Sequence, residues 1–217
     1  MAEDKLRTYT SEDLEVTWSR ARCIHFAACV RGLPVVFDTD KKPWIQPDEA
    51  DAADVIETVL RCPTGALHVR QKGEDIEEMP GENTVTPAPD GPLYLQGDIT
   101  LKNAAGKVIL RDTRVALCRC GASEHKPLCD GSHADASYRD SGALAQNQLK
   151  AGEASSSALT VSTSSNGPLL LEGRVKLRSV GNLSEYDGVS GALCRCGQTG
   201  HPPFCDGSHR AAGFEAE

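Results

Sequence analysis

Nine cysteines carry most of the chemical information in this 217-residue sequence. They fall into three groups, Cys23/Cys29/Cys62, Cys118/Cys120/Cys129 and Cys194/Cys196/Cys205. An odd number of cysteines cannot all pair internally, and clustered cysteines in a cytosolic chain bind metal more often than they form disulfides. The cysteines of each Cys-x-Cys pair also lie too close along the backbone for an unstrained disulfide. The sequence therefore predicts metal binding.

Two of these groups extend to a histidine in the pattern C-x-C-x8-C-x3-H. Each pattern supplies three thiols and one imidazole, which is a complete set of ligands for one centre. Three cysteines with one histidine suit either zinc or an iron-sulfur cluster, and spacing alone leaves both open. An aspartate after the last cysteine is expected to cap a short helix that carries the histidine. The candidate ligands are Cys118, Cys120, Cys129 and His133 in the first copy, and Cys194, Cys196, Cys205 and His209 in the second.

Both copies match C-x-C-x2-(S/T)-x3-P-x-C-D-G-(S/A/T)-H, so the chain resembles the CDGSH iron-sulfur, or mitoNEET-like, family over about 91–140 and 167–217. The resemblance implies a 2Fe-2S cluster in each copy, with the C-x-C pair on the buried iron and the third cysteine plus the histidine on the outer iron. Two copies in one chain resemble the monomeric members, whose tandem motifs replace the halves of a homodimer. A zinc-bound structural module is the alternative. The matching residues are Cys118, Cys120, Ser123, Pro127, Cys129, Asp130, Gly131, Ser132 and His133, then Cys194, Cys196, Thr199, Pro203, Cys205, Asp206, Gly207, Ser208 and His209.

Three neighbours of the ligands also recur in both copies. Arg119, between two cysteines, either neutralises cluster charge or is an exposed turn arginine. His125 is either part of a proton relay or a solvent-facing loop histidine, and the second interpretation is favoured. Ser123 is expected to form a hydrogen bond within the ligand loop. Their counterparts are Arg195, His201 and Thr199.

The first cysteine group has a different pattern, Cys23-x5-Cys29 followed by Cys62-Pro63-Thr64-Gly65-Ala66-Leu67. This half resembles the divergent single-cluster ferredoxin-like domains that occur alone or fused to CDGSH modules. The chain departs from a bacterial ferredoxin at Phe26, where C-x2-C-x2-C would place a cysteine. The resemblance thus implies either 3Fe-4S, or 4Fe-4S with a non-cysteine ligand, for which His25 is the nearest candidate. The alternatives are an ordinary loop histidine and a degenerate site of buried cysteines.

The two motif copies belong to an internal repeat of 76 residues, set by Cys118 and Cys194. Two copies are too few for a solenoid, so we expect a monomer with internal pseudo-twofold symmetry. The predicted domains are a ferredoxin-like domain over 1–80, a CDGSH module over 81–140, a linker over 141–166 and a second CDGSH module over 167–217. Clustered serine and glutamine favour the linker.

Short elements are expected to position the ligands. In the N-terminal module, 14–18 alternates as a strand, a helical pattern begins near Pro47, and 66–69 indicates a returning strand. In each repeat, an apolar run ends at Gly97 or Gly173, and separate alternating segments follow as small strands. The predicted fold class is α+β, with a small ferredoxin-like module followed by two mostly β modules, each with a short cluster-binding helix. Modules this small, with so few aromatic residues, bury a modest core and usually need a bound metal to stabilise the fold.

The composition and charge of the chain argue against several classes of function. A net charge of −8 argues against a nucleic-acid binder with a basic surface, and no apolar run reaches the length of a membrane helix. The acidic start lacks a secretory signal, so a cytoplasmic protein without membrane contact is expected. No nucleotide, flavin or nucleophile motif indicates an enzyme. The sequence predicts single-electron transfer between redox proteins; the alternatives are a cluster donor to apo-acceptor proteins, a redox or pH sensor, and a zinc-stabilised interaction module.

Overall fold

The computed structural model describes residues 6–76, 78, 81–154 and 156–216. The chain divides into two compact units, Met1–Met79 and Pro80–Glu217. No helix in the described part of the chain is long and apolar enough to cross a membrane.

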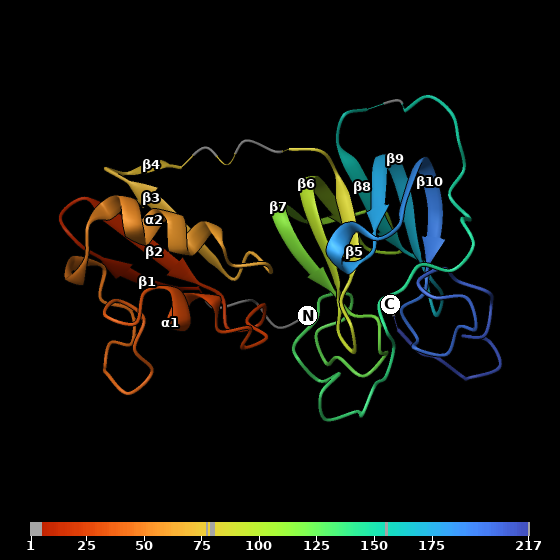
Figure 1. The fold of residues 1–217 in the computed structure, drawn as a ribbon, viewed down its shortest axis with the longest axis horizontal. Helices are drawn as coiled ribbons and strands as arrows, with labels where there is room; N and C mark the ends of the chain where they lie inside the picture. Colours follow the sequence, from red (N-terminus) through yellow and green to blue (C-terminus); the bar gives the residue numbers. More distant parts are fainter. Residues whose placement is uncertain (1–5, 77, 79–80, 155, 217) are drawn as a thin grey trace. The chain divides into compact units, whose positions relative to one another are not determined.

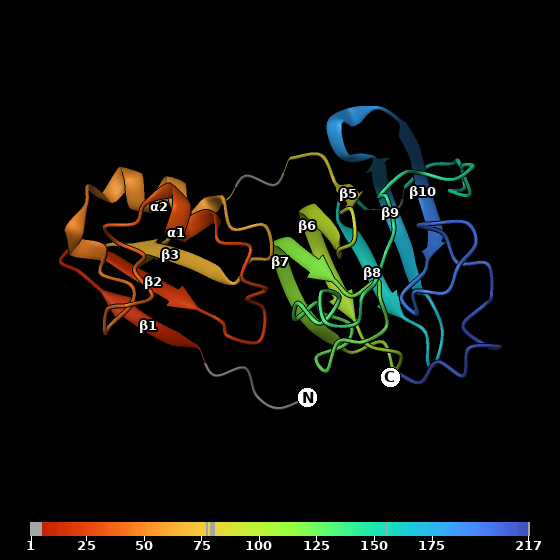
Figure 2. The ribbon, with the colours of Figure 1, turned by 60° about the horizontal axis from the view of Figure 1, so that its bottom comes forward.

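Unit 1 is a four-stranded antiparallel sheet with helices on one face (Figures 1 and 2). The sheet order is β1-β2-β3-β4, and the chain between β2 and β3 forms α1, the 3-10 helix η1 and α2. Val55 and Val59 of α2 belong to the same fully buried cluster as Val16 of β2. The predicted strand at 14–18 and the returning strand are confirmed, although the helical pattern divides into η1 and α2. The elements are β1 (Arg7–Thr10), β2 (Leu14–Trp18), α1 (Ala28–Gly32), η1 (Pro47–Glu49), α2 (Ala52–Leu60), β3 (Leu67–Gln71) and β4 (Glu74–Asp75).

Unit 2 contains both motif copies in one mostly β structure, shown from yellow to blue in Figure 1. The sheet order is β10-β9-β5-β6-β7, and β8 pairs with both β6 and β9. β5 pairs with β6 over 93–96 and with β9 over 176–177, whereas β8 pairs with β6 over 99–102 and with β9 over 169–172. The first strand of each repeat therefore pairs with strands of both repeats. The elements are β5 (Thr84–Pro87), β6 (Leu93–Lys102), β7 (Val108–Leu117), β8 (Leu159–Thr163), β9 (Leu169–Arg178), η2 (Val180–Asn182) and β10 (Glu185–Leu193).

The sequence repeat is also a structural repeat. Advancing β6 by 76 residues gives the bounds of β9, and the same step takes β5 and β7 to within one residue of β8 and β10. β8 lies inside the range predicted as a linker, so that part of the prediction was wrong. The reason is visible in its alternation, because Leu159, Val161 and Thr163 are buried in the shared core while the residues between them are not.

The apolar run and the alternating segment of each repeat form one ten-residue strand rather than separate strands. In β6 the pairing register shifts between Gln96 and Ile99, next to Gly97, whose φ is 128°. The Asn83 side chain lies where a Cβ at Gly97 would be. Its amide donates to the carbonyl of Arg174 at 3.0 Å and its oxygen accepts from the Asp98 N–H at 2.9 Å. Asn83 therefore joins β6 to β9 at this irregularity.

Candidate metal centres

The cysteines of each repeat are positioned by backbone hydrogen bonds at the end of a strand. β7 ends at Leu117, where the chain forms an isolated antiparallel bridge with Leu128. The Cys118 N–H donates to the Pro127 carbonyl at 2.8 Å, and the Cys129 N–H donates to the Ala116 carbonyl at 2.9 Å. These bonds place the third cysteine beside the C-x-C pair. The second copy repeats both bonds, from Cys194 to Pro203 at 2.8 Å and from Cys205 to Ala192 at 3.0 Å.

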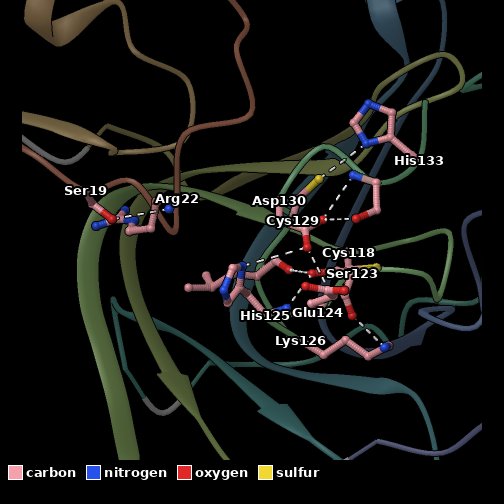
Figure 3. A network of polar contacts seen from close by, with 12 residues as sticks. Ser19, Arg22, Cys118, Ser123, Glu124, His125, Lys126, Cys129, Asp130 and His133 are labelled. Carbon is pink, nitrogen blue, oxygen red and sulfur yellow. Dashed lines mark hydrogen bonds and ion pairs between the residues drawn. The ribbon is translucent and has the colours of Figure 1, made fainter. Parts of the chain in front are cut away.

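The candidate donors form two close pairs in each copy. In the first copy, the Sγ atoms of Cys118 and Cys120 lie 3.7 Å apart. Figure 3 shows the second pair, in which Cys129 Sγ lies 3.4 Å from His133 Nδ1. The corresponding separations in the second copy, within Cys194/Cys196 and Cys205/His209, are 3.5 Å and 3.4 Å. Within the described ranges, no three Cys, His, Asp or Glu side chains form a group able to hold a single metal ion. The donors are therefore arranged as pairs.

Burial and a hydrogen bond between two thiols shift the pKa values of the cysteines. Burial raises the pKa of Cys129 to about 12 and that of Cys196 to about 11. The hydrogen bond between Cys118 and Cys120 raises the pKa of Cys118 and lowers that of Cys120 to about 7. A buried thiolate is costly without a nearby cation, so metal binding would release protons and strengthen as pH rises.

Asp130 organises the loop that carries the outer pair. Its Oδ1 accepts hydrogen bonds from the Ser132 N–H at 3.0 Å and hydroxyl at 2.6 Å, and its Oδ2 accepts from the Glu124 N–H at 2.8 Å (Figure 3). Partial burial opposes ionisation of Asp130, but these hydrogen bonds outweigh it and lower the pKa. Asp206 accepts equivalent bonds from the N–H groups of Ser208 and Gly200.

The predicted cluster-binding helix is wrong for both copies. The residues after Cys129 and Cys205 form successive turns. Asp130 bonds both to the turn after it and to Glu124 before it, so it fixes a loop instead of starting a helix. The turn still delivers His133 to Cys129, because the bond from the Ala136 N–H to the Ser132 carbonyl at 2.9 Å spans the histidine.

The recurring hydroxyl and loop histidine agree with the favoured interpretations. Ser123 donates to the Leu128 carbonyl at 2.7 Å, and Thr199 donates to the Phe204 carbonyl at 2.7 Å. His125 and His201 have side chains that are 48% and 61% exposed, which agrees with solvent-facing loop positions. A proton relay receives no support from this exposure.

The two recurring arginines are buried, which contradicts the alternative of exposed turn residues. Arg119 and Arg195 are each only 1% exposed. Arg119 donates to the Gly91 carbonyl at 3.1 Å and to Asp140 at 2.7 Å, and it stacks 5.3 Å from the Tyr138 ring. Arg195 likewise donates to the Gly167 carbonyl at 2.7 Å and stacks on Phe214. Each guanidinium therefore ties the turn between the first two strands of its repeat to the chain that follows its motif.

The two C-x-C loops meet each other. Cys120 and Cys196 form an antiparallel bridge. A Cβ on Gly121 would lie 2.8 Å from the Cys196 carbonyl oxygen, and one on Gly197 would lie 2.8 Å from the Cys120 carbonyl oxygen. Glycine is required at both positions, because the φ angles of 81° and 79° also disfavour a side chain.

The structure brings the N-terminal cysteines together as well. Cys23, Cys29 and Cys62 line one small cavity of about 30 Å³. Burial raises the pKa of Cys29 to about 11, with contributions from the charges of Cys62 and Cys23. Trp18 lines the same cavity, and its buried indole N–H has no acceptor within the described part of the chain. Sequence reasoning missed Trp18, because a tryptophan at a strand end carries no signal for a metal site.

His25 is not in that small cavity. It is exposed, with a left-handed φ of 56°, and it lines a larger neighbouring pocket together with Cys23 and Cys29. Phe26, at the position where a ferredoxin has its additional cysteine, is 48% exposed.

Comparison with known proteins agrees with this division. Residues 9–72 match the family described as divergent 4Fe-4S mono-cluster. Residues 90–134 and 166–210 match the family described as iron-binding zinc finger, CDGSH type. The N-terminal part is similar to the uncharacterized protein YjdI of Escherichia coli K12, with 46% identity over 66 residues that cover 30% of this chain and 87% of the relative.

YjdI from Escherichia coli O157:H7 matches with the same identity and coverage. No solved structure matches the chain. The paired cysteine and histidine donors thus lie in two regions with an iron-binding family signature, preceded by a third region with a cluster-binding signature. The chain therefore belongs to the CDGSH iron-sulfur family, in its tandem-motif form, fused to a divergent single-cluster ferredoxin-like domain.

Proposed function

We propose that this iron-sulfur protein holds two 2Fe-2S clusters and transfers single electrons between redox proteins. The observation that carries the proposal is the pairing of donors. A single zinc ion needs its four ligands around one point, whereas a two-iron cluster takes one pair of ligands on each iron. The close Cys–Cys and Cys–His pairs suit the second arrangement. Such a cluster supplies one-electron redox chemistry.

The chain's own residues set the conditions for that chemistry. In the second copy, Cys194 and Cys196 are buried whereas Cys205 and His209 are half-buried, so the histidine pair lies nearer the solvent. In the first copy each pair combines a buried cysteine, Cys118 or Cys129, with a half-buried partner. A neutral imidazole in place of a thiolate leaves the centre less negative and raises its potential. Burial lowers the pKa of His133, with Asp130 opposing and Arg119 adding to the effect, which favours the neutral form that binds iron.

The matched strands and the mutual packing of the C-x-C loops support a pseudo-twofold relation between two CDGSH modules in one monomer. We also propose a third cluster, 3Fe-4S or 4Fe-4S, held by Cys23, Cys29 and Cys62. The grouping of the three thiols supports it, because all three line one otherwise mostly apolar cavity. A cluster sulfide or cysteine thiolate there would also be an acceptor for the Trp18 indole N–H, which lacks one.

Cluster donation to an apo-acceptor is the second candidate function. The half-buried position of His133 and His209 favours it, since an acceptor thiolate could approach the histidine pair without unfolding the core. A donor should lose its absorbance while the acceptor gains it. A carrier should instead cycle between oxidised and reduced forms with its iron retained.

Iron, sulfide and zinc analysis with a visible spectrum tests the cluster assignment. We expect the full chain, purified anaerobically, to be red-brown with about seven or eight irons, and a Cys23→Ala/Cys29→Ala variant to hold about four. Four irons in both proteins would remove the third cluster while leaving the two CDGSH centres. A colourless protein that contains zinc would contradict electron transfer.

Exchanging the histidine ligands tests their role in acid sensitivity. His133→Cys and His209→Cys are each expected to slow the loss of their own cluster several-fold at about pH 5 to 6, because a protonated imidazole no longer binds iron. The decay of visible absorbance after a pH jump measures the rate. The solvent-facing His125→Cys is the matched control and should decay like the parent chain. Equal decay in all variants would mean that the histidine ligands do not control release.

A further inference from the structure

A second, larger pocket adjoins the N-terminal cysteines. It has a volume of about 760 Å³, within the range of small-molecule sites. Trp18, Cys23, Cys29 and Trp44 line both this pocket and the small cavity that contains Cys62. A ligand in the larger pocket would therefore lie directly beside the cysteine cluster. The pocket also contains aromatic wall residues, which is typical of small-molecule sites.

The lining carries positive charge in an otherwise acidic module. Residues 1–80 contain 16 acidic and 10 basic side chains, yet the pocket is lined by Arg7, Lys41 and Lys42 and by no carboxylate. The neighbouring Asp38 and Asp40 do not line it. Within the described residues, none of the three cations forms an ion pair; Arg7 instead stacks 5.6 Å from the Trp18 ring. Their charge is therefore available to a ligand.

The corner where the two cavities meet at Cys23 and Cys29 offers three cysteines as cluster ligands, but among the described residues no fourth cysteine or histidine lines the small cavity. Three cysteines reach the small cavity, Phe26 stands where a further cysteine would be, and His25 lines only the larger pocket. A 4Fe-4S cluster held by three cysteines has one iron without a protein thiolate. Because the two cavities share Trp18, Cys23, Cys29 and Trp44, an oxygen donor bound in the cation-lined pocket would lie beside this corner.

We propose that this pocket binds a small polyvalent oxyanion, a carboxylate or a phosphate, which also supplies the ligand that the three cysteines leave unfilled. The second half of the statement rests on the proposed third cluster and on its being 4Fe-4S, because three cysteines leave no iron of a 3Fe-4S cluster without a thiolate. Such binding would be ligand exchange alone, because an oxygen lone pair of the anion would displace solvent from the position that no cysteine fills and no electron would be transferred. Arg7, Lys41 and Lys42 bind the remaining negative charge.

Calorimetric titration of the intact, cluster-loaded chain with citrate, and separately with inorganic phosphate, tests the pocket. We expect saturable binding that weakens with added salt, and a Kd about tenfold higher or more in Lys41→Glu, since a charge-assisted contact becomes repulsive. Lys72→Glu is the matched control. Lys72 is in the same unit but outside the pocket, and it already lies 3.8 Å from Asp13. The anion that binds more tightly identifies the source of the oxygen donor.

Each outcome has a defined meaning. If neither anion bound, or if Lys41→Glu and Lys72→Glu weakened binding equally, the proposal that this pocket binds an oxyanion would be wrong. Binding of an acidic peptide but of neither small anion would overturn it in favour of a protein partner. A change in the electron paramagnetic resonance spectrum of the reduced N-terminal cluster on adding the anion supports ligation, and an unchanged spectrum with binding intact overturns ligation alone. Iron analysis is independent, so loss of the third cluster with anion binding retained would reject the proposed cluster and not the pocket.

Discussion

Gly121→Ala is expected to lose most of the iron at both CDGSH motifs, whereas Gly106→Ala is expected to keep it. The two glycines have similar left-handed φ angles, 81° and 78°. Each substitution therefore carries a similar backbone cost of about 1–2 kcal/mol. The added Cβ at Gly106 meets nothing within 4 Å, but at Gly121 it lies 2.8 Å from the Cys196 carbonyl oxygen.

The difference arises because that contact joins the two C-x-C loops. Cys196 belongs to the second motif, so a methyl group on the first loop displaces a predicted ligand of the other. Iron per chain, visible circular dichroism and the urea midpoint measure the effect, with Gly106→Ala as the control for backbone strain. Gly197→Ala should reproduce the loss through Cys120. If Gly121→Ala retained its iron and matched Gly106→Ala in stability, the two loops would not pack against each other in solution.

The sequence located the cysteines and histidines that lie together in the CDGSH motifs better than it predicted the architecture around them. Cysteine spacing and the 76-residue repeat are local features, and they located the residues that the structure brings into pairs. Strands β5 and β8 each pair with both β6 and β9. These pairings join segments that are far apart in the sequence, and the residue pattern of one strand does not indicate which distant strand it will pair with. Strand β8 was consequently included in a predicted linker.

Two further features depend on tertiary contacts. Arg119 has the residue type of a surface position, and only the carbonyls and carboxylate supplied by distant segments make its burial favourable. The cation-lined pocket collects residues from β1, β2, the α1 region and the 39–44 loop. No local spacing links Arg7 to Lys41, so charge counting over the whole module predicts an acidic surface and overlooks a basic pocket.

Arg119→Ala is expected to destabilise unit 2 by about 3–5 kcal/mol, because removing one partner of a buried ion pair leaves the other unpaired. The Arg119 side chain is 1% exposed and that of its partner Asp140 is 10% exposed. The same guanidinium also donates to the carbonyls of Gly91 and Ala88. The Gly91 carbonyl would lose this donor, whereas the Ala88 carbonyl would keep its bond from the Gly91 N–H. Lysine cannot reproduce this planar set of donors, so Arg119→Lys should recover only part of the loss.

Urea unfolding followed by circular dichroism measures these changes, and the exposed Arg111 of β7 provides a matched control. Arg111→Ala should change the free energy of unfolding by about 0.5 kcal/mol or less. A double-mutant cycle between Arg119→Ala and Asp140→Ala should show a coupling of about 1–3 kcal/mol, since the second substitution removes the unpaired carboxylate. Additive effects, or an Arg119→Ala chain as stable as Arg111→Ala, would contradict a buried pair. Because Arg119 lies between Cys118 and Cys120, the same substitution should lower iron retention at the first motif more than at the second.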